Sequence, residues 1–356
     1  MAIIVGLTDQ QRRMLIDTRQ LWEAWRVARE RRRSFSGSLS WKTSKGHEYL
    51  VKIASGSRAR VRKMTSLGPR SDLTELTKTS FERGRDEAEK RFKTISIRLG
   101  EQSRLNRAVG IGRVPIVAAK ILRRMDGEGL LGRNCIVAGT NALYAYESSA
   151  GVMIERSLLE TGDLDLLLEA RARLRLTLRG AEPSKIIDIL KSADSSFEKA
   201  ANGSSNAANA AGYLVELIKA EPRPPWKEER SALGEDDLQA AAIRNMRWVL
   251  NAPRFEAVAV GEDGAPVPIA APDPRAFAVY KLWMGQRDPT RDPVKRDRDV
   301  GQAYAVAEIV REYLPNLPFT QSELQMFPEE VRRLAVDSGL IRSPSKPDVA
   351  DPFFST

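Results

Sequence analysis

The feature that most restricts the fold is the segment TGDLDLLLEA at residues 161–170, in which two aspartates stand within a run of leucines. Its length and apolar residues indicate a buried β-strand. Side chains two residues apart on a strand share a face, so Asp163 and Asp165 lie side by side. They repel each other, and a divalent cation would remove that repulsion. Alternatively, the two aspartates lie at a solvated strand end or pair with Arg171 or Arg173. Taken alone, this segment favours that alternative over a metal site.

Upstream, the segment VAGTNALYAY is an apolar strand that leads through a Gly-Thr turn into a helix. Gly139 lets the backbone approach a ligand closely, and the first turn of the helix offers free N–H groups to a phosphate. The hydroxyl of Thr140 and the amide of Asn141 add donors. A Gly-Thr turn is common at strand-to-helix joints, so this signal by itself is weak.

Downstream, Glu216 is embedded in the apolar strand GYLVELIKA at residues 212–220. A lone acid in such a strand needs a partner or a metal ion. The alternative is a glutamate at the strand edge that faces water. If this strand lies beside 163–168, three carboxylates converge, which is the arrangement that two-metal phosphoryl transfer needs.

The segments GTNAL (139–143) and DLD (163–165), with Glu216, resemble the polymerase-β nucleotidyltransferase superfamily. More narrowly, GTNALYAYE, TGDLDLLLEA, AGYLVELIKA, DPRAFAVYKLWMGQR and KRDRDVGQA resemble a bacterial family of nucleotidyltransferase-like proteins related to abortive-infection toxin nucleotidyltransferases. GSLSWKTSKGHEYL and SLGPRS fit the same narrower pattern. The resemblance covers roughly residues 36–312.

The resemblance implies transfer of an NMP from an NTP to an acceptor hydroxyl, with Mg²⁺ or Mn²⁺ as cofactor and ATP among the candidate nucleotides. Two positions depart from the superfamily pattern: Thr140 replaces the usual serine, and Glu216 replaces the usual third aspartate. The implied site residues are Asp163, Asp165 and Glu216 for catalysis and metal binding, and Gly139, Thr140, Asn141 and Lys281 for the nucleotide.

The excess positive charge lies entirely in the first 110 residues. These contain 25 Lys and Arg against 12 Asp and Glu, whereas the remainder contains 32 against 35. A basic segment joined to a nearly neutral one favours a polyanionic partner, with nucleic acid first in line. The alternative is charge that serves only solubility. Taken with the resemblance, the charge favours RNA, including the end of a tRNA, as the acceptor.

The order of elements predicts an α+β protein in three regions. They are 1–128, with a basic helix, a three-stranded β-meander and a long helix that bind the acceptor; 129–270, with the small mixed β-sheet of a nucleotidyltransferase core; and 271–356, a helical C-terminal region. The meander spans 37–68 with its third strand near 59–63. Its aromatic residues Trp41 and Tyr49 either stack on a base or form a small core.

Composition excludes several kinds of site. A single cysteine, Cys135, rules out an internal disulfide and a cysteine-cluster metal site, and we expect it to be buried. A single histidine, His47, disfavours zinc sites and histidine-based catalysis, and we expect it to be exposed beside a turn. The chain has no apolar run of membrane-spanning length and no signal peptide, so we expect a cytoplasmic protein without a membrane partner.

Two later groups of charges have both functional and structural interpretations. Lys281 stands in an apolar helix beside Tyr280 and Trp283, where it either binds phosphate or extends along the surface to water. The charged run at residues 295–299 is interpreted as a solvated loop and helix start, which then continues as a helix over 298–314.

The sequence thus predicts a nucleotidyltransferase that modifies RNA, with a toxin-like or defence-like role implied by the resemblance alone. Two other interpretations stay open. One is an inactive transferase core that binds nucleotide or RNA, and the other is NMP transfer to a protein or a small molecule. The base of the NTP and the oligomeric state are not specified.

Overall fold

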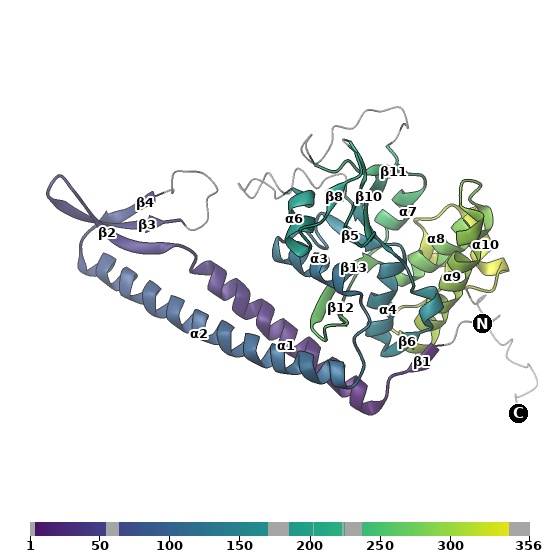
Figure 1. The fold of residues 1–356 in the computed structure, drawn as a ribbon, viewed down its shortest axis with the longest axis horizontal. Helices are drawn as coiled ribbons and strands as arrows, with labels where there is room; N and C mark the ends of the chain where they lie inside the picture. Colours follow the sequence, from purple (N-terminus) through teal and green to yellow (C-terminus); the bar gives the residue numbers. More distant parts are fainter. Residues whose placement is uncertain are drawn as a thin grey trace, which may run out of the picture. The chain divides into compact units, whose positions relative to one another are not determined.

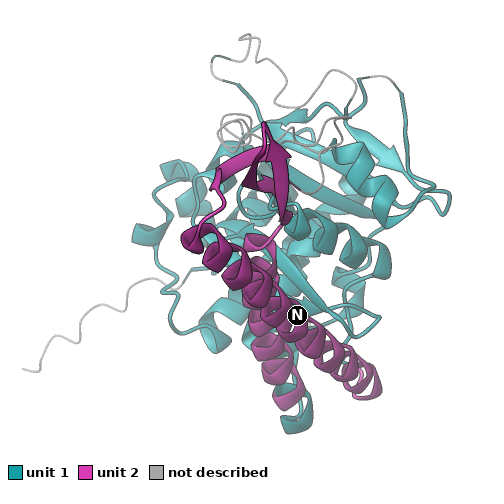
Figure 2. Ribbon diagram, turned by 90° about the vertical axis from the view of Figure 1, so that its left-hand side faces the viewer, with its two compact units in different colours: residues 1–12, 111–356 teal, residues 13–110 magenta. Residues whose placement is uncertain are grey.

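The computed structural model describes residues 4–54, 64–169, 185–201, 203–222, 224 and 237–341. The chain divides into two compact units (Figure 2). We call residues 13–110 the arm, and residues 1–12 together with 111–356 the body. This division differs from the three predicted regions, because the predicted core and the helical C-terminal region share one unit and the first twelve residues belong to it as well.

Two long helices, α1 (Asp9–Ser34) and α2 (Asp72–Ala108), lie side by side along the arm (Figure 1). Between them the Trp25 and Phe92 rings are in contact, with centroids 5.7 Å apart. Both helices were predicted, and Gly84 and Gly100 do not interrupt α2. At Gly84 a Cβ atom would lie 2.5 Å from the Phe35 ring, so the missing side chain permits close packing there.

At one end of the arm, three antiparallel strands form a small sheet in the order β2 (Ser38–Ser44), β3 (His47–Ile53) and β4 (Met64–Pro69). The meander is confirmed, with Lys45 and Gly46 at its first turn in left-handed conformations. The third described strand is β4, and the predicted third strand near 59–63 lies outside the described residues.

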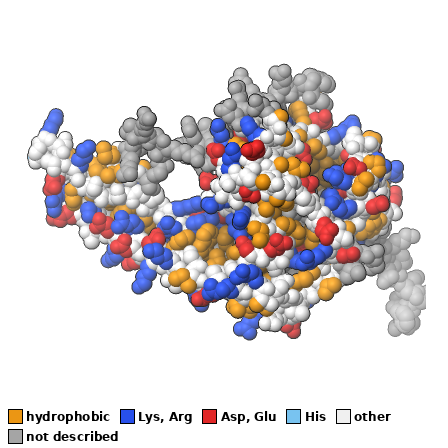
Figure 3. Space-filling model, viewed as in Figure 1, with side chains coloured by type: hydrophobic (Ala, Val, Ile, Leu, Met, Phe, Trp, Pro, Cys, Tyr) orange, Lys and Arg blue, Asp and Glu red, His pale blue; other side chains and the backbone are white. Residues whose placement is uncertain are grey.

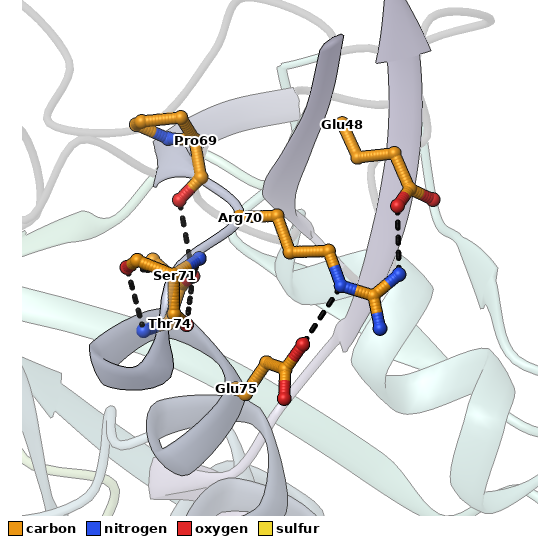
Figure 4. Close-up of polar contacts among 6 residues, drawn as sticks. All are labelled: Glu48, Pro69, Arg70, Ser71, Thr74 and Glu75. Carbon is orange, nitrogen blue, oxygen red and sulfur yellow. Dashed lines mark hydrogen bonds and ion pairs between the residues drawn. The ribbon is translucent and has the colours of Figure 1, made fainter.

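Arg70 joins this sheet to the start of α2 (Figure 4). It forms ion pairs with Glu48 of β3 at 2.7 Å and with Glu75 of α2 at 2.8 Å. Its guanidinium also lies over the Trp41 ring, 5.1 Å from the centroid. One face of Trp41 is therefore covered by protein rather than presented to a base.

The body is built around a mixed sheet. Its strands follow the order β5 (Cys135–Ala138), β7 (Asp163–Leu168), β10 (Leu214–Ala220), β9 (Asn206–Ala208) and β8 (Glu198–Lys199), and β11 (Ala241–Ile243) also pairs with β10. Strand β7 runs antiparallel to β5 and parallel to β10. The sequence alone also predicts a strand at 173–178 and a polar turn at 203–212. The first lies outside the described residues. The second contains strand β9, since Asn206–Ala208 pairs with β10.

Two further pairs of antiparallel strands complete the β-structure of the body. Strand β1 (Ile4–Gly6) pairs with β6 (Val152–Ile154), and this pair was not predicted. Strands β12 (Arg254–Val260) and β13 (Pro266–Pro272) form a hairpin, which the sequence alone predicts over 255–270 with Asp263 and Gly264 at its turn. Gly264 has a φ of 78°.

Helices of the body pack around these strands. In chain order they are α3 (Ile116–Gly127), α4 (Leu143–Ala150), α6 (Ile186–Ala193), α7 (Met246–Leu250), α8 (Pro274–Arg287), α9 (Pro293–Tyr313) and α10 (Glu329–Asp337), with 3₁₀ turns η1 (Thr140–Ala142), η2 (Arg156–Leu158) and η3 (Gln321–Leu324). Helices α8, α9 and α10 lie together (Figure 1). Helix α9 begins earlier than predicted because Asp292 caps it and Pro293 fits its first turn.

The described elements confirm the predicted α+β class, with a mixed sheet and a helical C-terminal region. Cys135 is buried and His47 exposed, as expected. Burial raises the pKa of the Cys135 thiol to about 12, which makes it unreactive. In the part of the chain that the structure describes, no helix is both long and apolar enough to cross a membrane.

Candidate active site

Strands β7 and β10 bring the three predicted carboxylates to one region of the sheet. Asp163 and Asp165 share a face of β7, while Leu164 and Leu166 between and after them are fully buried. Glu216 pairs with Asp165 across the parallel ladder. Residues in register on neighbouring strands project to the same face, so Glu216 lies beside Asp165. The alternation of β7 thus separates its leucines from its carboxylates.

Gly139 stands where β5 ends, next to Asp165. Ala138 pairs with Asp165 in the antiparallel ladder, and Gly139 has a φ of 62°. A Cβ atom built on Gly139 would lie 2.0 Å from Oδ2 of Asp165. Only glycine fits here, both for its left-handed backbone and for this approach to the carboxylate. The predicted glycine turn and residues 163–165 of β7 are therefore neighbours in space.

Thr140 and Asn141 follow in the same turn and are almost completely buried. The side-chain Nδ2 of Asn141 donates to the backbone oxygen of Asp163 at 2.7 Å. The hydroxyl of Thr140 accepts a hydrogen bond from Nε2 of Gln302 on α9 at 3.1 Å. Asn141 therefore connects the glycine turn to β7, and its amide nitrogen is already engaged.

Lys281 is buried rather than extended along the surface, so the surface interpretation of this residue is wrong. Its Nζ donates to Oδ1 of Asp299 at 2.6 Å, and the other oxygen of Asp299 accepts from Nε of Arg291 at 2.5 Å. Asp299 itself is completely buried, so the solvated interpretation of the run 295–299 is wrong at this residue. The two cations and one carboxylate carry a net charge of +1.

The carboxylates and this cationic group act on each other electrostatically. Burial, chiefly, and then the charge of Asp163 and Glu216 raise the pKa of Asp165 to about 6, while Lys281 and Lys295 oppose that rise. Burial is the main cause that lowers the pKa of Lys281, and the nearby Asp299 opposes that shift. Negative charge is thus crowded at Asp165, with positive charge within its electrostatic reach.

Two hydroxyl groups border the carboxylates. Thr161 donates from its hydroxyl to the carboxylate of Asp163, and the Tyr213 hydroxyl lies 3.5 Å from the backbone oxygen of Asp163. Burial and the charge of Asp163 raise the pKa of the Tyr213 phenol well above its ordinary value, so it stays protonated at neutral pH. It is therefore a neutral donor at this edge.

Sequence reasoning missed five residues of this region: Thr161, Tyr213, Arg291, Asp299 and Gln302. Asp299 and Gln302 are spaced i and i+3 on α9, so they share one face of that helix. The predicted helix 298–314 already contained both residues, and the Asp-Pro pair at residues 292–293 is a helix-start signal that would have placed its first turn correctly. Thr161 stands two residues before Asp163 within the segment already singled out, and Tyr213 one residue before β10.

The residues present fit a divalent cation by their chemistry. Carboxylate oxygens are the ligands that Mg²⁺ and Mn²⁺ prefer, and three of them stand on adjacent strands with like charges crowded at Asp165. Over the described ranges, however, no three His, Cys, Asp or Glu side chains lie in an arrangement that could already hold a metal ion. The strand register makes the three carboxylates neighbours, and binding of a cation would require them to turn toward one ion.

The body thus combines an α+β fold with an Asp165 carboxylate packed against the glycine turn at Gly139. A family model described as nucleotidyltransferase matches residues 117–327. This match spans more than half of the chain, and the chain therefore belongs to the nucleotidyltransferase family. It contains every site residue discussed above, whereas the arm lies outside it. Searches of curated proteins and of solved structures gave no match.

Proposed function

We propose that the body is a metal-dependent nucleotidyltransferase of the polymerase-β type that moves an NMP from an NTP to an acceptor hydroxyl and releases pyrophosphate. Membership of the nucleotidyltransferase family supports the transfer of a nucleotidyl group in general. The single observation that carries the finer proposal is the register that places Glu216 beside Asp165, with Asp163 two residues away on the same face.

In this proposal Asp163, Asp165 and Glu216 would hold Mg²⁺ or Mn²⁺, which supplies charge neutralisation at the phosphates of the NTP. The third acid, Glu216, would also orient the attacking hydroxyl. Gly139 lets the Asp165 carboxylate approach the end of β5, where a side chain would collide with it, and the backbone of this turn would bind the phosphates. The cationic group of Lys281 and Arg291, held by Asp299, would face the negative charge of the triphosphate.

The arm supports RNA as the acceptor through both its charge and its aromatic residues. Three arginines at the end of α1 lie over aromatic rings, at 4.9 Å for Arg29 on Trp25, 4.6 Å for Arg31 on Phe35 and 4.6 Å for Arg32 on Phe92. Stacking on a ring orders a guanidinium, so less side-chain entropy is lost when it binds a phosphate. Arg32 also pairs with Glu89 at 2.7 Å. On the face in Figure 3, acidic side chains lie among the basic ones, so the excess charge is distributed.

The experiment is to incubate the full-length protein with each labelled NTP and Mg²⁺, in separate reactions with total RNA, protein and small-molecule acceptors. We expect label to transfer to RNA and Asp163→Ala and Asp165→Ala to abolish that transfer while the protein stays folded. If the label appears on protein or on a small molecule instead, the proposed reaction stands and RNA is not its acceptor.

If no acceptor is labelled, the enzyme proposal fails. Nucleotide or RNA binding that persists in EDTA without turnover in Mg²⁺ would then identify an inactive core that binds its ligand. The toxin-like role stays a prediction of the sequence resemblance, and growth arrest on expression, lost in Asp165→Ala, is its test.

A further inference from the structure

Gln302 is a buried glutamine on α9 that contacts the glycine turn from the side of the helical region. Its side chain is 0% exposed. Its amide nitrogen donates to the backbone oxygen of Leu158 at 2.7 Å and to Oγ1 of Thr140 at 3.1 Å. The two acceptors belong to η2 and η1, so one amide group joins both turns to α9.

The direction of these hydrogen bonds follows from the chemistry of Leu158. A backbone carbonyl oxygen can only accept, so the side-chain atom of Gln302 that faces it must be the NH₂ group. The second hydrogen of that NH₂ group points to Thr140. Oγ1 of Thr140 is therefore an acceptor here, and the proton of the Thr140 hydroxyl is directed elsewhere. Across the described ranges, that hydroxyl donates to no protein acceptor.

We infer that Gln302 is a positioning residue that keeps the proton of the Thr140 hydroxyl available for a phosphate oxygen of the NTP. Phosphate oxygens at neutral pH accept hydrogen bonds, so a hydroxyl binds one only if its own proton is free. By occupying the acceptor side of Oγ1, Gln302 fixes the hydroxyl as a donor toward the ligand. This inference rests on the proposed function, in which Thr140 binds the phosphates.

Helix α9 then positions two different groups for the same ligand. Asp299 and Gln302 lie one turn apart, and the first holds Lys281 while the second holds Thr140. Both side chains are completely buried, so each is held in one orientation by the surrounding core. Helix α9 thereby fixes the position of both the Lys281 cation and the Thr140 hydroxyl.

Replacement of the amide by a carboxyl group is the sharpest test, because Gln302→Glu keeps the shape of the side chain. A carboxyl group in either protonation state lacks the two N–H donors and offers an oxygen to which Thr140 donates its proton. Gln302→Met removes the polar atoms with little change of volume. The binding probe is the α,β-methylene analogue of each NTP with Mg²⁺, with the matching NMP measured in parallel.

We expect Thr140→Val to weaken binding of the triphosphate analogue about tenfold or more, because a hydrogen bond to a charged group is lost. Gln302→Glu should weaken it to a similar extent, and Gln302→Met less, because the hydroxyl is then free to rotate. The double variant Thr140→Val with Gln302→Glu should bind no more weakly than either single variant, and NMP affinity should change little.

Gln102 offers a matched control in the arm, since it is also buried and hydrogen bonded, to Asn106 at 3.0 Å. Gln102→Met should lower the melting temperature without changing affinity for the triphosphate analogue. If Gln302→Glu does not fold, Gln302→Met is compared in the wild-type and Thr140→Val backgrounds. This comparison also tests whether Gln302 acts on affinity through Thr140.

Additive losses for Thr140→Val and the Gln302 variants, or equal losses for NMP and triphosphate, would overturn the inference and leave Gln302 a packing residue. If the wild type turns over NTP and the Gln302 variants bind the triphosphate analogue as the wild type does, the inference is rejected while the proposed function stands. Absence of NTP binding and turnover in the wild type rejects the proposed function itself, so the two failures are distinguishable.

Discussion

The arm and the body use ion pairs of the same chemistry in opposite surroundings. In the arm, the side chains of Arg70 and Glu48 are 49% and 41% exposed, whereas those of Lys281 and Asp299 in the body are 6% and 0% exposed. Water competes for the first pair and is excluded from the second. The exposed pair of the arm is therefore weak, while the buried pair of the body holds its charges in fixed positions.

The largest difference between the units should appear in catalysis. Asp163→Asn or Asp165→Asn should lower the rate of NMP transfer about 1000-fold or more, because each removes a carboxylate at which the metal would bind. Asp263→Asn is the control, since Asp263 pairs with Arg123 at 2.6 Å at the β12–β13 turn and is none of the proposed metal ligands. Rates from labelled-NTP transfer, with the melting temperature of each variant, check this. Near-normal transfer in Asp165→Asn would contradict it.

Removal of one partner from each ion pair should show the effect of burial on stability. Asp299→Asn leaves Lys281 and Arg291 without their shared carboxylate, and we expect the free energy of unfolding to fall by about 3 kcal/mol. Glu48→Gln in the arm should leave the unfolding midpoint almost unchanged, because its pair is exposed. Denaturant titrations of both variants test this, and equal losses would show that burial does not separate the two units.

The pH dependence of stability should reveal the crowded charge at Asp165. Its folded-state pKa of about 6 lies above the ordinary value of 3.8, so the folded protein binds this proton more tightly than the unfolded chain. Its contribution to stability is therefore greatest below pH 4 and is lost as the pH rises through 6. In EDTA, wild type should lose up to about 3 kcal/mol more than Asp165→Asn between pH 4 and pH 7. Parallel curves for the two proteins would refute the shift.

The smallest effect should come from single cations of the arm. Arg31→Gln should weaken RNA binding several-fold and reduce the salt dependence by about 0.7 in log–log slope for a lost contact to a single strand. Lys78→Gln is the control, because Lys78 already pairs with Glu82 at 2.6 Å. Neither change should alter the KM for NTP. An unchanged salt slope in Arg31→Gln would remove Arg31 from the acceptor surface.

Much of the site could be predicted because its signals are local. The alternation of Asp163 and Asp165 with leucines follows from strand geometry alone, and Gly139 at a strand-to-helix joint is a local signal as well. The condition set for the third acid, that the strand of Glu216 lies beside 163–168, is met by the register of Glu216 with Asp165, while its role stays a prediction. Both long arm helices also follow from their capping residues and periodicity.

Two of the missed residues, Asp299 and Gln302, depend on contacts between segments that are separated in the sequence. Gln302 bonds to a residue 162 positions earlier in the chain, and Asp299 to one 18 positions earlier. A charged residue in a mixed run has no local property that distinguishes a buried ion pair from a solvated one.

The sequence by itself determined the faces of β7, the glycine of the turn, the class of the fold and the concentration of positive charge before residue 111. Propensity, alternation and capping act over a few residues, so they can be read along the chain. Only the tertiary structure decided which charges are buried, which hydroxyl is held as a donor and which acid stands beside Asp165. Those properties depend on the packing of the whole core, because burial and hydrogen-bond partners come from segments that the chain brings together only when it folds.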